Sequence, residues 1–171
     1  MHRFDRHRHV RAQTMMDENR PRVVIIDDDE MDQELYRLAF GRLDQEVELI
    51  CFEDGAAAAA GLLQLHEADP DEHPAVVLVD LYMPPIDGVD LLGLRRRQLR
   101  DWDVPFVMIS SSDTPADRER SRRAGCDGYI VKPDGFDALV GILREEVVPY
   151  LRGEHADDDD TSASAAPEQG R

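Results

Sequence analysis

Short apolar runs recur along the chain at residues 23–26, 47–51, 76–79, 106–109 and 129–131. Runs of this length, rich in Val and Ile, are typical of strands that are buried on both faces of a parallel sheet. Longer segments that can form helices separate them. Strict alternation of strand and helix predicts a parallel sheet covered by helices through right-handed crossovers.

Helix start and stop signals support the segments between the runs. Met31, Leu35 and Leu38 recur at helical spacing and stop at Gly41, a residue that commonly ends helices. Further signals are Asp54 before an alanine-rich helix ending near His66, Thr114 before Pro115, Gly125, and the stripe Phe136, Leu139, Leu143 and Val147 that Pro149 disturbs. These signals predict one helix after each strand.

Composition narrows the protein class. A chain of 171 residues can hold one domain with tails, and its net charge of −17 disfavours nucleic-acid binding, which depends on Lys and Arg. No apolar run approaches the ~20 residues of a membrane span, so we expect a cytoplasmic protein. Cys51 and Cys126 fall in segments that we place on opposite sides of the sheet, so we expect two free thiols.

The two ends differ from the middle. Residues 1–22 hold six arginines and three acidic residues, a net charge of +3, and show no apolar periodicity. We interpret 1–21 as a disordered basic leader, 22–151 as the folded domain and 152–171 as a disordered acidic tail. The leader also contains His2, His7 and His9, so a metal or nucleic-acid contact there is the less favoured alternative.

Polar residues follow four of the apolar runs. Asp27 to Asp29 follow the first, Asp80 the third, Ser110 the fourth and Lys132 the fifth. Each alone is more simply a capping or surface residue. However, the carboxyl ends of parallel strands meet at one edge of the sheet, where α/β proteins place their sites. Lys132 is also the only lysine, because the other 19 basic residues are arginine.

Carboxylates that face one lysine and one hydroxyl suit phosphoryl transfer. Mg²⁺ is commonly held by one or two carboxylates and keeps positions for water and phosphate oxygens. A carboxylate can itself attack phosphorus and form an aspartyl phosphate. The cluster therefore predicts an Mg²⁺-dependent phosphoryl site.

The motifs VVIIDDDE, VVLVDLYMPPIDG, PFVMISSSD and AGCDGYIVKP, in this order, closely resemble the receiver domains of two-component response regulators. The resemblance covers about residues 22–151. It implies a flavodoxin-like, doubly wound α/β fold with five parallel strands in the order 2-1-3-4-5 and a site between strands one and three. The chain is most similar to single-domain, chemotaxis-regulator-like members and, on motif style alone, to those that serve phytochrome-type sensors.

The resemblance also assigns roles to individual residues. It implies that Asp80 accepts a phosphoryl group from a phosphohistidine of a sensor kinase and that Lys132 pairs with that group. Asp28 would bind Mg²⁺ directly, Asp27 would support it, and Asp80 and the backbone carbonyl of Tyr82 would complete the ligands. Asp29 lengthens the acidic run, so a register slip of one residue stays open.

The conformational output follows from the same resemblance. Ser110 occupies the position of the switch hydroxyl, and Tyr129 that of the aromatic residue that turns inward after it. The peptide bond from Lys132 to Pro133 is expected to be cis. Independently, the helix in TPADRERSRRAG has almost no apolar residue besides Ala116 and Ala124, so we expect it to shift easily.

The residues that follow the folded domain indicate which kinds of partner to expect. After Arg152 only about 20 polar residues remain, too few for a further domain. We therefore expect no DNA binding, and contacts with a histidine kinase, a phosphotransfer protein or a downstream target. A homodimer through the fourth helix, fifth strand and fifth helix is also expected, with Arg118, Arg120, Arg122 and Arg123 meeting Glu145 and Glu146. Solvation of these charges is the alternative.

Two other functions remain open from the residues. A haloacid-dehalogenase-type phosphatase also uses an aspartate, Mg²⁺ and a lysine, with Asp27 and Asp29 in its DxD motif, but it gives Asp80 no role. In addition, Asp134 and Asp137 lie too close behind Lys132 to supply its second acidic pair. A phosphorylation-independent pseudo-receiver is disfavoured because every chemical position is filled.

Overall fold

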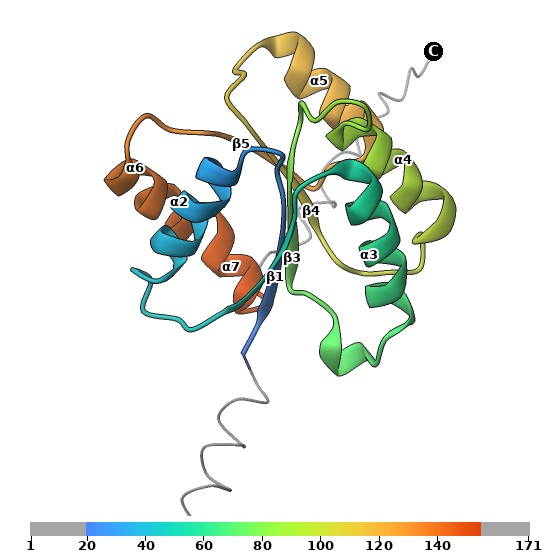
Figure 1. The fold of residues 1–171 in the computed structure, drawn as a ribbon, viewed down its shortest axis with the longest axis horizontal. Coiled ribbons are helices and arrows are strands. Elements are labelled where there is room, and N and C mark those ends of the chain that lie inside the picture. Colours follow the sequence, from blue (N-terminus) through green and yellow to red (C-terminus); the bar gives the residue numbers. More distant parts are fainter. Residues whose placement is uncertain (1–19, 155–171) are drawn as a thin grey trace, which may run out of the picture.

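A computed structural model describes residues 20–154 (Figure 1). The strands are β1 (Arg22–Ile26), β2 (Glu48–Phe52), β3 (Val76–Asp80), β4 (Phe106–Ser110) and β5 (Gly128–Val131). The helical elements are α2 (Glu30–Phe40), α3 (Gly55–Glu67), η1 (Pro70–Glu72), α4 (Gly88–Gln98), α5 (Pro115–Ala124), α6 (Phe136–Ile142), η2 (Leu143–Val147) and α7 (Val148–Leu151). Nearly all of the expected leader and tail lies outside the described residues.

The five strands form one parallel sheet in the order β2-β1-β3-β4-β5, which confirms the expected topology. Helices cover both faces, with α2, α6 and α7 on one side and α3, α4 and α5 on the other (Figure 1). Alternate residues of each central strand pack into two separate cores, one under each helical layer. Consequently β3 is buried along its whole length.

The strands extend beyond the apolar runs that predicted them. Asp80 is the last residue of β3 and pairs with Ile109, and Ser110 is the last residue of β4 and pairs with Val131. Parallel pairing depends on backbone groups, so a polar side chain does not end it. The two candidate residues therefore belong to the sheet and not to loops.

The predicted helix caps are confirmed. Asp54 accepts a hydrogen bond from the backbone of Ala57, and Thr114 accepts one from Asp117. Gly125 ends α5 in the left-handed conformation, with φ at 94°. Both cysteines are free, as expected. Within 20–154, no helix is long and apolar enough to cross a membrane.

The helix predicted from the spacing of Met31, Leu35 and Leu38 is present, but Met31 and Leu38 do not face the core. Met31 is 72% exposed and Leu38 53% exposed, whereas Gln33, Tyr36, Ala39 and Phe40 are buried. The buried residues also recur at helical spacing, but they lie on a different face of the helix from Met31 and Leu38. The aromatic rings bury more apolar area against the sheet than Met31 and Leu38 offer, and this decides the orientation of the helix.

The last helical segment runs to Leu151 but is not one regular helix. A π-helical stretch, η2, separates α6 from α7 and ends just before Pro149. Proline has no backbone N–H and crowds the carbonyl one turn earlier, so the hydrogen-bond pattern changes ahead of it. Leu139, Leu143 and Val147 still face the core, as predicted.

Gly88 makes possible the close packing of α4 against the end of β3. A Cβ there would lie 2.5 Å from the backbone oxygen of Asp80 and 2.5 Å from the terminal methyl of Met108. We expect Gly88→Ala to lower the free energy of unfolding by about 1–3 kcal/mol, because backbone would have to move. Gly141→Ala is the matched control, since nothing lies within 4 Å of its Cβ position. Urea unfolding of both variants checks this; equal stability of the two would contradict it.

Candidate functional site

The carboxyl ends of the strands bring the predicted side chains together. Asp27 follows β1, Asp80 ends β3, Ser110 ends β4 and Lys132 follows β5. These four strands are consecutive neighbours in the sheet. Lys132 comes from the far edge of this group, and its long side chain spans the distance to the acidic residues of β1 and β3.

The ammonium of Lys132 lies among three carboxylates. Its Nζ is 2.8 Å from Asp27 Oδ2, 2.7 Å from Asp32 Oδ2 and 2.9 Å from Asp80 Oδ1. The side chain of Asp27 is 1% exposed and that of Asp80 10% exposed. Lys132 thus joins β1, α2, β3 and β5 through one group, largely out of contact with water.

The remaining oxygens of the buried acids are held by backbone. Asp80 Oδ2 accepts a hydrogen bond of 2.9 Å from the N–H of Tyr82, and Asp27 Oδ1 accepts one of 3.0 Å from that of Asp29. The buried amide of Gln33 donates to the carbonyls of Asp27 and Phe52. Both carboxylates therefore have a fixed orientation before any ligand arrives.

Burial dominates the electrostatics of the site. Loss of solvation raises the pKa of Asp27 and of Asp80 above the ordinary value, although Lys132 acts in the opposite direction. Burial also disfavours the ammonium, but the neighbouring Tyr36, Asp27 and Asp32 outweigh it and raise the pKa of Lys132. One ammonium facing three carboxylates leaves the cluster with excess negative charge, so it can accept a further cation.

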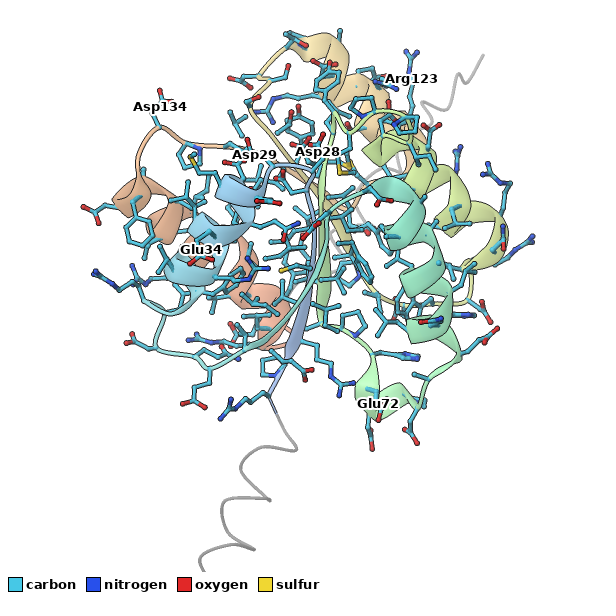
Figure 2. The ribbon with its side chains drawn as sticks, in the orientation of Figure 1. Asp28, Asp29, Glu34, Glu72, Arg123 and Asp134 are labelled. Carbon is cyan, nitrogen blue, oxygen red and sulfur yellow. The ribbon has the colours of Figure 1, made fainter. Side chains whose placement is uncertain are left out.

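The residues of the acidic run after β1 have different roles. Asp28 is exposed, and its charge contributes to the raised pKa of Asp80, so the two carboxylates influence each other. Asp29 caps α2 by accepting from the backbone of Met31 and Asp32. Both lie at the upper end of β1 (Figure 2). Because Asp29 is committed to the cap, the register with Asp27 and Asp28 at the site fits better than a slip of one residue.

The donor set fits a hard cation. Among the described residues no three acid, imidazole or thiol groups are arranged to hold a metal ion, and Lys132 lies where the carboxylates of Asp27, Asp32 and Asp80 converge. Asp28, Asp27 and Asp80 supply only oxygen donors and excess negative charge, the chemistry that Mg²⁺ prefers. Together with the Tyr82 carbonyl they remain the predicted ligands.

The two expected switch residues meet in the loop after β4. Ser110 is fully buried, and its hydroxyl oxygen accepts a hydrogen bond of 3.2 Å from the N–H of Ser112. Tyr129 is half-buried and donates its hydroxyl proton to the backbone oxygen of Ser112, at 2.8 Å. The guanidinium of Arg118 lies 4.9 Å from the centre of the Tyr129 ring. Ser112 is therefore the shared contact of both residues.

Two residues near the site were missed by the sequence analysis. Asp32 belongs to the first turn of α2, and the only available signal was its position three residues after the capping Asp29. Asp117 accepts hydrogen bonds from Tyr82, Ser112 and Thr114, but its spacing from Thr114 suggested only a helix cap. The hydrogen bond from Ser112 lowers the pKa of Asp117, with Tyr82 and Thr114 adding to the effect.

The prediction of a cis bond before Pro133 is wrong. Within 20–154 the cis peptide bond lies between Pro84 and Pro85, and the bond from Lys132 to Pro133 is trans. The trans form of an X–Pro bond is intrinsically favoured by about 0.5–1 kcal/mol. With it, the Lys132 N–H donates to the Ser110 carbonyl at 2.8 Å and Nζ still reaches the carboxylates, so no contact requires the cis form.

Solved structures of low sequence identity share the fold. The phosphorylated cyanobacterial phytochrome response regulator RcpA has 21% identity and a TM-score of 0.65, with 78% of this chain and 96% of that chain covered. The Mn²⁺-bound form of response regulator Rcp1 has 23% identity and a TM-score of 0.64, with 85% and 99% covered. At these identities the likeness establishes the architecture alone.

Sequence comparisons establish the family. The family model of the response regulator receiver domain matches residues 23–144. The probable methanogenesis regulatory protein FilR2 of Methanothrix harundinacea (strain 6Ac) is 30% identical over 131 residues, which cover 77% of this chain and 83% of that protein. Two other curated relatives are matched over only 59% and 38% of their length. The chain therefore belongs to the response regulator receiver domain family of two-component signalling.

Proposed function

We propose that the protein is a phospho-acceptor in which Asp80 receives a phosphoryl group from a histidine kinase. The observation that carries this proposal is the position of Asp80: it is buried, oriented by the Tyr82 N–H and held 2.9 Å from Lys132. A carboxylate in this position can act as a nucleophile, and a fixed cation stands beside it to receive negative charge.

In the proposed step, a carboxylate oxygen of Asp80 attacks the phosphorus of a phosphohistidine. The new P–O bond forms as the P–N bond breaks, and the imidazole nitrogen leaves with the electron pair and takes up a proton. Lys132 changes partner from the Asp80 carboxylate to the phosphoryl oxygens, while Asp27 and Asp32 keep it in place. Mg²⁺ bound near Asp28 would supply charge neutralisation for the transferred group.

Ser110 is the proposed sensor of the phosphorylated state. Its hydroxyl oxygen accepts from Ser112, which leaves its proton for an oxygen of the phosphoryl group. A new dianion with charge-assisted hydrogen bonds then shifts the loop after β4, where Tyr129 is anchored. We propose that the output is this change in shape, read through protein contacts, and that the protein turns over no substrate besides its own phosphoryl group.

The proposed partner is a sensor histidine kinase, and a phytochrome-type kinase is the narrower candidate. RcpA, whose fold is similar, is a phytochrome response regulator solved in its phosphorylated state, and Rcp1 was solved with Mn²⁺. Both support the same chemistry for this chain. A cytoplasmic location, a downstream protein or phosphotransfer target, and the absence of DNA binding complete the proposal.

A homodimer through α5, β5 and α6 is a further part of the proposal, but its expected charge pairs are already used. Arg118 pairs with Asp113, Arg120 with Asp87, and both Arg122 and Arg123 pair with Glu119. Glu145 and Glu146 are exposed. Cross-pairing in a dimer would exchange one set of exposed ion pairs for another, which changes the free energy little.

Phosphorylation tests the proposed function directly. We expect acetyl phosphate and Mg²⁺ to add one phosphoryl group to the wild type, detected by intact-mass spectrometry, and none to Asp80→Asn. Chelation of Mg²⁺ with EDTA should abolish the addition. Asp134→Asn is the matched control, because Asp134 is an exposed acid in the loop that follows Lys132 (Figure 2).

The same experiment separates the alternatives. Addition to Asp80→Asn together with loss in Asp27→Asn would make Asp27 the nucleophile, as in a phosphatase of the haloacid-dehalogenase type. No addition to the wild type at any Mg²⁺ concentration would leave a pseudo-receiver.

The site is expected to reduce the stability of the fold. Because burial raises the pKa of Asp80, the folded state disfavours its charge. At pH 7 in EDTA, urea unfolding should therefore give Asp80→Asn a free energy of unfolding about 1 kcal/mol higher than that of the wild type. Because the pKa of Asp80 is higher in the folded than in the unfolded protein, the difference should shrink as pH falls through the raised folded-state pKa and be gone below the unfolded-state value of about 4. Asp134→Asn should change stability by less than about 0.5 kcal/mol. A wild type more stable than Asp80→Asn at pH 7 would contradict this.

A further inference from the structure

Polar contacts, more than apolar packing, determine where α5 lies. Within this helix only Ser121 and Ala124 are buried. Its other residues are mainly charged, and several reach neighbouring elements, as Arg120 does with the Asp87 carboxylate at the start of α4. A helix with so little buried apolar area is held in place by a small number of hydrogen bonds and ion pairs, so the loss of one of them has a measurable effect.

Asp117, in the first turn of α5, collects three of these hydrogen bonds. Its Oδ1 accepts a 2.6 Å hydrogen bond from the phenol of Tyr82, which belongs to the loop after β3. Its Oδ2 accepts from the hydroxyl groups of Ser112 and Thr114, in the loop after β4. One half-buried carboxylate therefore fastens both loops beside the phospho-acceptor to the same helix.

These contacts form a continuous path between the acceptor and the switch hydroxyl. Asp80 accepts from the Tyr82 N–H, and the Tyr82 phenol donates to Asp117. Asp117 in turn accepts from the Ser112 hydroxyl, and the Ser112 N–H donates to the Ser110 hydroxyl. Each residue on the path uses two different groups, one on either side, so a displacement at one end strains the next contact.

We propose that Asp117 is a positioning residue that couples α5 to the state of Asp80. The inference rests on the proposed function, because it needs Asp80 to take up a phosphoryl group. When Ser110 moves toward the new phosphoryl oxygens and Tyr82 adjusts to the phosphoryl group on Asp80, both loops move, and Ser112 and Tyr82 withdraw their hydroxyl groups from Asp117. The first turn of α5 then loses its connection to the site and opens more often.

A helix cap is the alternative role for Asp117. The Thr114 hydroxyl accepts from the Asp117 N–H and donates to the Asp117 carboxylate, which stabilises the start of α5 without any link to Asp80. The two roles use different partners. A cap requires Thr114 and is indifferent to the Tyr82 phenol, whereas coupling requires Tyr82 and Ser112.

Hydrogen exchange of the α5 amides distinguishes a cap from a coupling residue. It is measured by mass spectrometry with and without acetyl phosphate and Mg²⁺. In the wild type we expect phosphorylation to accelerate exchange in the first turn of α5. In Tyr82→Phe and Asp117→Ala the unphosphorylated protein should already exchange roughly fivefold faster, as expected for the loss of a hydrogen bond. Phosphorylation should then add little further acceleration in Asp117→Ala and less than in the wild type in Tyr82→Phe.

Two control variants complete the design. Thr114→Ala removes the cap but keeps the path, so it should exchange faster in both states and retain the phosphorylation-dependent difference. Glu119→Gln lies on the same helix, and in the part of the chain that the structure describes its ion pairs are with Arg122 and Arg123 of that helix, so it should retain the phosphorylation-dependent difference.

Intact-mass spectrometry on the same samples distinguishes failure of the proposed function from failure of the coupling through Asp117. If the wild type gains no phosphoryl group, the proposed function fails. If the wild type is phosphorylated but Tyr82→Phe keeps the full phosphorylation-dependent change in α5, the coupling through Asp117 is overturned. An effect of Thr114→Ala equal to that of Asp117→Ala, with none from Tyr82→Phe, would reduce Asp117 to a cap.

Discussion

The ammonium of Lys132 among three carboxylates is the interaction on which the rest of the site depends. It bonds to Asp27, Asp32 and Asp80, which come from three different parts of the chain. Without this cation, Asp27 and Asp80 would be close, buried charges of the same sign, which is costly in a medium of low dielectric constant. Lys132 lowers the pKa of Asp27 and Asp80 against the effect of burial and orients both carboxylates, yet one ammonium faces three acidic groups. The remaining negative charge favours a divalent cation, and in the proposed function the cation and Lys132 together would offset the negative charge of the phosphoryl group.

The fold creates this arrangement, and hydrogen bonds of the loops after β3 and β4 connect it to α5 at the surface. A parallel sheet in the order 2-1-3-4-5 places the ends of β1, β3, β4 and β5 next to each other, on a core that buries β3 and β4 completely. The strands are rigid, whereas α5 has little apolar area of its own. Chemistry at a rigid centre can therefore act on an adjustable helix through hydrogen bonds such as those of Asp117. This division between a fixed site and a movable helix is the physical basis of the proposed switch.

Much of the fold could be predicted from sequence because buried parallel strands need continuous apolar runs, and helix caps need specific residues. The strand order and the meeting of Asp80 with Lys132 followed from resemblance and topology. The buried face of α2 could not be predicted from Met31 and Leu38, since two overlapping apolar stripes compete and only packing chooses between them. Contacts such as that of Asp32 depend on side-chain direction in three dimensions, which spacing along the chain does not contain.

Because Lys132 is the only lysine in the chain, ¹⁵N-lysine labelling gives NMR access to this one ammonium group. Side-chain ammonium resonances of exposed lysines are lost to rapid exchange at neutral pH, whereas a buried, hydrogen-bonded ammonium exchanges slowly. The account predicts one slowly exchanging ammonium resonance near pH 7, which shifts on addition of Mg²⁺ and again on addition of acetyl phosphate. An ammonium that exchanges as fast as a free lysine, with no response to either addition, would contradict the central place given to Lys132.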